Sequence, residues 1–552
     1  MLKQELVNCL RQAIEEAQRK GALASTALPE VIIEHPQNPE HGDFASGLPL
    51  KLARAVKMSP MAIAEIALEH MSPPPEIGRV TIASPGFINF TLREDWLSRQ
   101  VEAILAAGES YGGINLGKGK RVQLEFVSVN PTGPLHVGHG RGAVLGSTLA
   151  NVLAASGFSV EKEYYVNDTG SQIENFGHSL YVRYLQCLGR EADLPPGGYY
   201  GDYMIDLARE IIQVQGDSLL ALPESDAVSQ LAEVGLGRML QGIKEDFALL
   251  NVSFDTWFSE KSLYQGGQYE KAMELLRSGG YITERENATW FGSSSLGEDK
   301  DNVLIRSDGQ PTYFASDIAY HYNKFVERGF DRVIDIWGAD HQGHVPRMKA
   351  MLRALGREPE QLTIILHQLV TLRRGQDIVR VSKRSGDIVT LRELLEEVGP
   401  DACRFVFLSR SADAQMDFDI ELAKRQSADN PVYYVQYAHA RIASILRLAE
   451  QRGIDYDDGD ACLLASEPEL TLIRRLILLP QIVERVAVNL EPHHLPHYAQ
   501  DLATVFHSFY KQCRVVSEDE ALTGARLKLV KATQIALARV LGLMGMTAPD
   551  RM

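Results

Sequence analysis

The sequence is poor in cysteine and in long apolar runs, and it has no excess of positive charge. Its five cysteines lie far apart among 552 residues. No Cys-x-x-Cys pair occurs, so neither a disulfide framework nor a cysteine zinc site is predicted. No run of about 18 apolar residues occurs, which excludes a membrane-spanning helix. The segment Met1 to Glu5 has no apolar signal core. We therefore expect a protein of the reducing cytoplasm.

The net charge and the length set further limits. A net charge of −16 argues against a protein that binds polyanions over its whole surface, but it leaves room for a local basic patch. With 45% hydrophobic and 23% charged residues, the composition is that of an ordinary globular protein. The chain is too long for one hydrophobic core, because cores stop growing at about 250–300 residues. Several domains are therefore expected.

The periodicity of apolar residues divides the chain into three parts. Residues 1–115 combine an amphipathic helix with a half-buried strand pattern near residues 88–92, which predicts a small α+β domain. Residues 120–420 alternate strands with helices and predict a Rossmann-type parallel sheet with an insertion at about 190–300. Residues 421–552 show only helical periodicity, typical of an all-α bundle. The predicted fold class is multidomain α/β.

Several element boundaries can be stated in advance. The apolar residues Val303 to Ile305 predict the return of the α/β pattern after the insertion. The C-terminal part predicts helical runs at 433–448, 470–488, 495–516 and 521–543, the last of them opened by a capping box at Ser517 to Glu520.

The most informative segment is Glu125-Phe-Val-Ser-Val-Asn-Pro-Thr-Gly-Pro-Leu-His136-Val-Gly-His139-Gly. It joins the first predicted strand of the parallel sheet to the next helix, at the sheet edge where ligands bind. A helix N-terminus offers unpaired N–H groups to phosphate, and the glycines Gly138, Gly140 and Gly142 would let a nucleotide approach the backbone. Two surface histidines at a helix start are an equally open interpretation. The segment is neither a Walker A loop nor a GxGxxG turn.

A second segment is basic in an otherwise acidic chain. Residues 373–386 read Arg-Arg-Gly-Gln-Asp-Ile-Val-Arg-Val-Ser-Lys-Arg-Ser-Gly, with five cations and one acid. Such a loop can place an ammonium and a hydroxyl on a transferring phosphate. A solvated basic loop without a specific role remains the alternative.

Together the two segments resemble the HIGH and KMSKS signatures of class I aminoacyl-tRNA synthetases, and the whole chain resembles the arginyl-tRNA synthetases. His136-Val-Gly-His139 corresponds to HIGH, and Arg380-Val-Ser-Lys383-Arg384 corresponds loosely to KMSKS. The segment Tyr165 to Gln172, Tyr-Val-Asn-Asp-Thr-Gly-Ser-Gln, and the chain end from Gly542 to Met552 add specificity to the match. The resemblance covers essentially the whole chain and is weakest in the insertion.

The resemblance implies the catalytic groups and an ATP site. The implied catalytic residues are His136, His139 and Lys383. The implied ATP-binding residues are Asn130, Pro131, Thr132, Gly133, Pro134, Leu135, His136, Val137, Gly138, His139, Gly140, Ser382, Lys383 and Arg384. Many members of the family carry a lysine where this chain has Gly133. Its absence here implies that Lys383 takes over that role.

The resemblance also implies an arginine site. The implied arginine-binding residues are Glu125, Ser128, Asn130, His139, Tyr313, Asp317, His341 and Gln342. Carboxylates suit this substrate, because the planar guanidinium pairs with them bidentately. Tyr313 and Asp317 are four residues apart, so both can face one pocket from a helix. For Glu125, an internal salt bridge with a lysine or arginine is the open alternative.

The helical C-terminal part resembles the anticodon-binding bundle of the family. Tyr433, Tyr437 and Arg441 follow one another at four-residue steps, which predicts a stacking platform for unpaired bases, although packing inside the bundle is as good an interpretation of each tyrosine. The last helix carries Arg526, Lys528, Lys531 and Arg539 without an acid from 521 to 541, which predicts a solvated phosphate-binding stripe. Residues 38–44 are our candidate contact to the tRNA elbow.

The function implied is that of an arginine–tRNA ligase. ATP, entering with Mg²⁺, and L-arginine form arginyl-adenylate and pyrophosphate, and the arginyl group then passes to the 3′ end of tRNA(Arg). We expect a monomer with no membrane partner, no tightly bound cofactor and no metal-ligating residues of its own. A class I synthetase for lysine or glutamate and a noncatalytic tRNA-binding relative are the alternatives. Glu125 and Asp317 argue against an acidic substrate, and His136, His139 and Lys383 argue against a pure binder.

Overall fold

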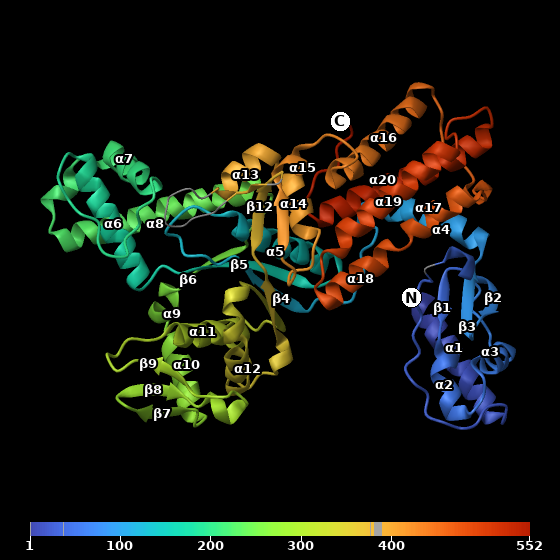
Figure 1. The fold of residues 1–552 in the computed structure, drawn as a ribbon, viewed down its shortest axis with the longest axis horizontal. Helices are drawn as coiled ribbons and strands as arrows, with labels where there is room; N and C mark the ends of the chain where they lie inside the picture. Colours follow the sequence, from blue (N-terminus) through green and yellow to red (C-terminus); the bar gives the residue numbers. More distant parts are fainter. Residues whose placement is uncertain (1, 37, 376, 380–388) are drawn as a thin grey trace. The chain divides into compact units, whose positions relative to one another are not determined.

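The computed structural model describes residues 2–36, 38–375, 377–379 and 389–552 (Figure 1). The predicted ATP-loop residues Ser382, Lys383 and Arg384 lie outside the described residues. The chain forms two compact units, and neither is a single continuous segment. Unit 1 consists of Met1–Gly108, Ile445–Ile477 and Val505–Thr533, and unit 2 consists of Glu109–Ser444, Leu478–Thr504 and Gln534–Met552.

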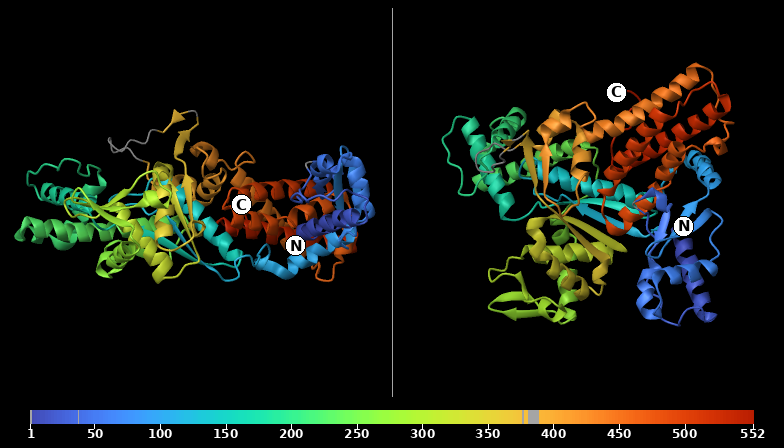
Figure 2. Two further views of the ribbon diagram at one scale, coloured as in Figure 1. Left: turned by 90° about the horizontal axis from the view of Figure 1, so that it is seen from below. Right: turned by 45° about the vertical axis from the view of Figure 1, so that its right-hand side comes forward.

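Unit 1 begins with the predicted α+β arrangement (blue in Figures 1 and 2). Its first elements are α1 (Leu2–Arg19), β1 (Phe44–Ser46), α2 (Leu48–Val56), α3 (Pro60–Glu69), β2 (Ile77–Ala83), β3 (Phe87–Leu92) and α4 (Glu94–Ala107). The strands form an antiparallel sheet in the order β1-β3-β2. An ion pair of 2.8 Å between Asp43 and Arg474 ties this part to the later helical segments of the same unit.

Unit 2 contains the predicted parallel sheet. Its strands are β4 (Arg121–Phe126), β5 (Ser159–Val166), β6 (Thr256–Ser259), β10 (Arg332–Gly338) and β11 (Leu362–His367), in the order β11-β10-β4-β5-β6. All four pairings are parallel. The chain first adds strands on one side of β4 and then crosses to add β10 on the other. The strand order therefore reverses between β4 and β10, which is where ligands bind in open α/β sheets.

The predicted insertion at about 190–300 is not one inserted segment, because it includes β6 of the central sheet. This strand has only four half-buried residues, too short a pattern to recognise in sequence. The helices α6 (Ser171–Cys187), α7 (Tyr203–Gln215) and α8 (Glu224–Leu249) lie between β5 and β6 and share one core (teal to green in Figures 1 and 2).

A second group of elements lies between β6 and β10. These are α9 (Lys261–Gln265), α10 (Gln268–Ser278), β7 (Ile282–Arg285), β8 (Ala288–Phe291), β9 (Asn302–Ile305) and α11 (Tyr313–Tyr322). The strands form an antiparallel sheet in the order β7-β8-β9. The expectation that Val303 to Ile305 resumes the parallel sheet is therefore wrong, because this run pairs with the hairpin beside it.

The rest of the chain is mainly helical. Its elements are α12 (Val345–Ala354), β12 (Val370–Arg374), β13 (Asp377–Ile378), α13 (Leu391–Val398), α14 (Pro400–Leu408), β14 (Met416–Asp419), α15 (Ile420–Lys424), α16 (Pro431–Gln451), α17 (Glu467–Leu476), α18 (Leu479–Asn489), α19 (His494–Gln512) and α20 (Glu520–Leu543). The predicted run 470–488 is two helices, α17 and α18. Asp519, rather than Ser517, caps α20 through the N–H of Leu522 at 3.0 Å. None of the helices among the described residues is long and apolar enough to cross a membrane.

Helix α5 (Val137–Ala155) covers the sheet and is buried along nearly its whole length. A Cβ atom added to Gly146 would overlap the ring of Phe126 on β4. The glycine therefore lets helix and strand approach closely, which fixes the position of the α5 N-terminus above the sheet edge.

We predict that Gly146→Ala lowers the midpoint of thermal unfolding, because overpacking of this kind costs about 1–3 kcal/mol. Gly237→Ala in α8 is the matched control, since an added Cβ meets no atom within 4 Å there and alanine favours the helix by up to about 1 kcal/mol. Circular dichroism of the two variants tests the pair. Equal melting of Gly146→Ala and the parent would contradict the close packing of α5 on β4.

Candidate active site

The two histidines of the first motif lie at the N-terminus of α5. His136 is the N-cap residue, and its Nδ1 accepts the N–H of Gly138 at 3.2 Å, while Nδ1 of His139 accepts the N–H of His136 at 3.2 Å. The two rings stack with their centroids 3.4 Å apart. Because each Nδ1 accepts a backbone N–H, a neutral ring carries its proton on Nε2. Both rings are thus donors suited to phosphate oxygens beside a helix N-terminus.

Two glycines of the motif lie against neighbouring side chains of the protein. A Cβ on Gly140 would lie 2.7 Å from Cδ1 of Leu391, and one on Gly142 would lie 3.1 Å from Nε2 of His367. Neighbouring side chains thus occupy the space beside these two glycines, and contact of a nucleotide with their backbone stays a prediction. Arg141 of the same motif is fully buried and donates to the carbonyls of Gln368, Ser411 and Ala414 at 2.8–2.9 Å.

The loop between β4 and α5 is held by tyrosine hydroxyls. Tyr164 donates to the carbonyl of Val129 at 2.7 Å, and Tyr203 of α7 donates to the carbonyl of Thr132 at 2.8 Å. The loop starts with two non-glycine residues in the left-handed region, Val127 and Ser128. Such strain costs about 1–3 kcal/mol per residue and clusters at functional sites.

The remaining predicted residues of this loop are mostly fixed by the protein. Ser128 Oγ accepts the N–H of Tyr165 at 3.2 Å, and the Asn130 amide donates to Gln172. Pro131, Thr132, Leu135 and Val137 are buried side chains, so only their backbone can serve a ligand. Gly133, by contrast, lies against the Tyr203 ring.

The segment that follows the undescribed residues 380–388 returns to this motif. Leu391 donates its N–H to the carbonyl of Leu135 at 2.8 Å, and Thr390 forms a β-bridge with His136. On the other side, Val379 donates its N–H to Leu372 at 2.9 Å. Thr390 also forms the predicted capping box with Glu393 at the start of α13. Thr390 and Leu391, which closely follow the predicted KMSKS-like segment in the sequence, are thus tied to the histidine turn.

Glu125 makes an internal salt bridge, which was the open alternative for this residue. Its Oε2 lies 2.6 Å from Nζ of Lys324, and the same Nζ lies 3.0 Å from Oδ1 of Asp335 on β10. Lys324 is fully buried. Burial disfavours its ammonium, but Asp335 and Glu125 outweigh this and raise the pKa of Lys324. Burial also raises the pKa of Glu125, although Lys324 opposes it.

This buried charge network was not predicted from sequence. Asp335 accepts a hydrogen bond from His321 at 3.0 Å, and Glu163 on β5 pairs with Arg328 at 2.5 Å. Lys324 lies in a π-helical turn, Asn323–Glu327, directly after α11. In the sequence, Lys324 is a lysine next to an apolar helix, and strand β5 carries several charged residues. Neither feature identifies which residues pair with each other.

Asp317 on α11 lacks a direct cationic partner among the residues that the structure describes. Within the described part of the chain, its carboxylate forms no ion pair or hydrogen bond. Burial raises the pKa of Asp317 to about 6, with His321 and Arg347 acting in the opposite direction. Burial and then the charges of Glu260, Asp317 and Glu125 raise the pKa of Tyr165. These three carboxylates therefore lie close enough to Tyr165 to act on it, and their combined negative charge suits a cationic ligand.

The other predicted ligand-binding residues are accessible. Tyr313, on the first turn of α11, is 56% exposed. His341 and Gln342 are exposed in the 3₁₀ turn Ala339–His344, which follows β10. His341 contacts Trp337 edge-on with ring centroids 6.0 Å apart. The turn that carries His341 and Gln342 therefore lies at the sheet edge where the strand order reverses.

Tyr433, Tyr437 and Arg441 lie next to one another along α16, as their four-residue spacing predicts. The rings of Tyr433 and Tyr437 are nearly parallel, with an interplanar angle of 10° and centroids 6.1 Å apart. The guanidinium of Arg441 lies 5.1 Å from the Tyr437 ring centroid and donates to the Tyr437 hydroxyl at 3.2 Å. Tyr437 is 37% exposed, so this face is accessible to a planar base.

The predicted solvated cationic stripe on α20 is wrong for Arg526 and Lys528. Arg526 pairs with Glu469 at 2.7 Å, and Lys528 pairs with Glu102 at 2.8 Å. Both side chains are mostly buried, because α20 is enclosed on most of its surface. Arg539 donates to the carbonyl of Tyr111 at 3.1 Å, and Lys531 is half-buried. The acidic partners of Arg526 and Lys528 thus lie on other helices than α20.

Comparisons with known proteins give a consistent result. Three family models match successive parts of the chain: the arginyl tRNA synthetase N terminal domain at residues 4–92, the class I (R) tRNA synthetase catalytic domain at 100–416, and the DALR anticodon binding domain at 435–552. An arginine–tRNA ligase of Dehalococcoides mccartyi is 58% identical, over 100% of this chain and 99% of its own length. That of Carboxydothermus hydrogenoformans is 48% identical, over 99% and 98%.

The fold agrees with this result. The structure of the Thermus thermophilus arginyl-tRNA synthetase superposes with a TM-score of 0.79 over 100% of both chains, at 23% sequence identity. At this identity the likeness concerns the fold alone. The predicted multidomain α/β fold class is confirmed.

We predict that Asp317→Asn stabilises the ligand-free protein at neutral pH. The carboxylate is ionised above its folded pKa of about 6 and above its ordinary unfolded value near 4, so the folded state carries the full cost of the charge there. As the pH falls from 6 to 4, the folded form takes up a proton first, and the cost disappears. The variant should be more stable by at most about 3 kcal/mol at pH 7 and equal to the parent at pH 4.

Melting midpoints of the parent and of Asp317→Asn between pH 4 and pH 8 test this prediction. Asp299→Asn is the control, because Asp299 is exposed and should give the same difference at every pH. A less stable Asp317→Asn at pH 7 would mean that the carboxylate already has a partner.

Proposed function

The chain belongs to the arginyl-tRNA synthetase family, and from this membership we propose how its active site works. It is an ATP-dependent enzyme that joins L-arginine to tRNA(Arg). The carboxylate oxygen of arginine attacks the α-phosphorus of ATP, and pyrophosphate leaves with arginyl-adenylate formed. A ribose hydroxyl at the tRNA 3′ end then attacks the carbonyl carbon, and AMP leaves.

The observation that carries the substrate assignment is the uncompensated charge of Asp317. A half-buried carboxylate without a cationic partner among the described residues, beside Glu260 and Glu125, favours a substrate with a positive side chain. We assign the guanidinium of arginine to Asp317, because two parallel N–H···O bonds match its geometry. These carboxylates would repel an acidic amino acid, which argues against glutamate as the substrate.

Glu125 acts on arginine through the oxygen that Lys324 does not occupy. Its Oε2 is engaged by Lys324 at 2.6 Å, so one carboxylate oxygen is kept in place by the protein. The accessible residues Tyr313, His341 and Gln342 complete the proposed arginine site. Ser128 and Asn130 contribute by holding this loop rather than by free side chains.

The ATP site is assigned to the N-terminus of α5. His136 and His139 donate from Nε2 to phosphate oxygens, and the backbone N–H groups of the α5 N-terminus favour their negative charge. ATP enters as its magnesium complex. Lys383, together with Ser382 and Arg384, takes the role of the lysine that many members of the family carry at the position of Gly133. The anchoring of Thr390 and Leu391 on the histidine turn supports this assignment.

Catalysis then consists mainly of positioning and charge stabilisation, because the reaction needs no covalent intermediate with the protein. The α-phosphate gains charge as the arginine carboxylate approaches in line. The imidazole donors and the lysine ammonium stabilise that charge. The carboxylates of Asp317 and Glu125 hold the arginine side chain and so orient its α-carboxylate for attack.

For tRNA we propose the platform of Tyr433, Tyr437 and Arg441 as a base-stacking surface. The three-part division into residues 1–115, 120–420 and 421–552 remains our proposal for the functional domains, and the ranges of the three family models support it. We also propose a cytoplasmic, monomeric enzyme, in keeping with the composition and the resemblance.

Arginine-dependent exchange of pyrophosphate into ATP, in the presence of tRNA, should be observed for the parent. Asp317→Asn should raise the KM for arginine about 100-fold or more, because loss of one partner of a buried ion pair costs about 3–5 kcal/mol. The KM for ATP should change less than about twofold. Asp299→Asn is again the control and should behave as the parent.

Two outcomes would contradict this assignment. Equal losses for ATP and arginine would mean that Asp317 supports the structure of the whole site. Exchange that depends on another amino acid, or no exchange at all, would overturn the assigned substrate or activity.

Tyr437→Ala should raise the KM for tRNA, because one base–aromatic stack is worth about 1–3 kcal/mol, or roughly 5–150-fold. Arg441→Gln should have a smaller effect in the same direction, since Arg441 supports the Tyr437 ring. Lys528→Gln is the contrast: it breaks an internal ion pair and should lower the melting midpoint without changing the KM for tRNA. An unchanged KM in Tyr437→Ala would remove α16 from the interface.

A further inference from the structure

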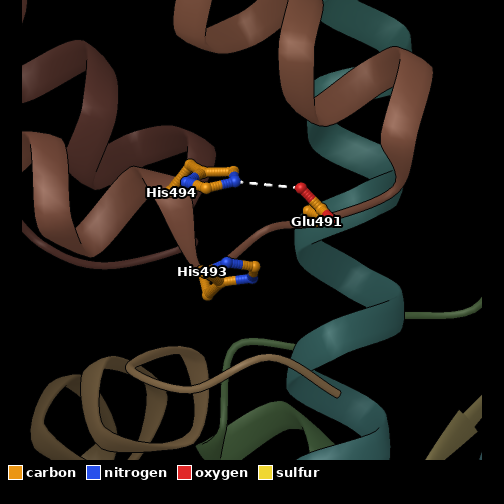
Figure 3. A group of neighbouring side chains, drawn as sticks. All are labelled: Glu491, His493 and His494. Carbon is orange, nitrogen blue, oxygen red and sulfur yellow. Dashed lines mark hydrogen bonds and ion pairs between the residues drawn. The ribbon is translucent and has the colours of Figure 1, made fainter. Parts of the chain in front are cut away.

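Three metal-ligating side chains converge in the turn between α18 and α19. Glu491, His493 and His494 each offer one ligand atom, and these atoms lie within 4.8 Å of one another (Figure 3). Nε2 of His494 is 3.0 Å from Oε2 of Glu491, and the centroids of the two imidazole rings are 4.2 Å apart. Among the residues that the structure describes, no other group of three histidine, cysteine, aspartate or glutamate side chains has this spacing.

The backbone of this turn is ordered by local contacts. Helix α18 ends at Asn489, and the next residue, Leu490, is left-handed at φ 59° and donates its N–H to the carbonyl of Val486 at 2.8 Å. The buried Pro492 accepts the N–H of Leu495 at 3.0 Å, in the first turn of α19. Helix α18 also packs on α5. The three ligands are therefore presented by a preformed turn, and little ordering is needed to bind an ion.

One atom of the group is left unsatisfied. Nδ1 of His493 is buried without a hydrogen-bond partner in the described structure, and a polar atom in this position needs an explanation. This nitrogen is therefore available as a ligand atom for an ion.

One positive charge, which would repel a metal ion, lies near the three side chains. Arg485 on α18 lies 4.0 Å from Oε2 of Glu491, but it is 55% exposed, so solvent screens its charge. The ring of His497 on α19 is farther away, with its centroid 5.9 Å from that of His493. Glu491 itself is 43% exposed, which leaves an entry path for an ion and room for water.

We propose that Glu491, His493 and His494 bind one divalent transition-metal ion, preferentially Zn²⁺, with water as the fourth ligand. Two imidazoles and one carboxylate form a ligand set that zinc prefers, and tetrahedral ligands at about 2.1 Å lie roughly 3.4 Å apart. Small side-chain rotations bring the present atoms to that spacing. Ca²⁺ and Mg²⁺ need more oxygen ligands than this turn supplies. The ion would join the end of α18 to the start of α19.

The site is independent of the aminoacylation chemistry, so its test does not rely on activity. The full-length chain, freed of metal with a chelator, is titrated with Co²⁺ and followed by visible absorption. We expect one Co²⁺ per chain with the strong d–d bands of a tetrahedral site, displaced by one equivalent of Zn²⁺. Absence of such bands would overturn the proposal.

Variants assign the bound ion to these residues. His493→Ala and the milder Glu491→Gln should lose the cobalt bands and the rise in melting midpoint that Zn²⁺ gives the parent. His497→Ala is the matched control, because it removes a nearby imidazole that is outside the group, and it should keep both. If His493→Ala fails to fold, Glu491→Gln decides. Tetrahedral binding that persists in Glu491→Gln or disappears in His497→Ala would refute the assignment.

Discussion

The buried ammonium of Lys324 is the constraint on which the active site depends. It joins Glu125 on β4 to Asp335 on β10, the two strands between which the sheet order reverses. Removal of one partner from such a buried group costs about 3–5 kcal/mol, so the ends of the two strands are held together at the ligand-binding edge. The same contact occupies one oxygen of Glu125. Lys324 is used in this way and forms no ion pair with Asp317 in the described part of the chain, which supports our proposal that Asp317 binds the substrate.

The site therefore combines satisfied and unsatisfied charges over a short distance. Arg141 and Arg404 are fully buried, and each donates to several backbone carbonyls; these contacts hold α5 and α14 in place. Asp317 and the left-handed Val127 and Ser128 are costs that the packed sheet tolerates. The rigid surroundings hold these groups in the geometry that substrate binding needs. The folded protein is less stable for it, as is common where function requires strained or unpaired groups.

The histidine motif could be predicted because its chemistry is local: a strand, a turn and a helix N-terminus within a short segment bring His136 and His139 together. The partner of Glu125 could not be predicted, since Lys324 is 199 residues away in the sequence. The prediction of a solvated cationic stripe on α20 was wrong for the same reason. Arg526 and Lys528 pair with Glu469 and Glu102, which lie on other helices. The sequence of α20 alone therefore does not show that these cations are paired and mostly buried.

The sequence by itself determined the alternation of strands and helices, the catalytic motifs and the family, because these depend on residue order and on spacings of a few positions. The tertiary structure alone decided which charges are paired. It placed β6 within the central sheet, turned Gly140 and Gly142 toward protein neighbours, and gathered Glu125, Glu260 and Asp317 around Tyr165. The physical reason is that burial and Coulomb interactions act between residues close in space, whereas periodicity reports only on residues close in the chain.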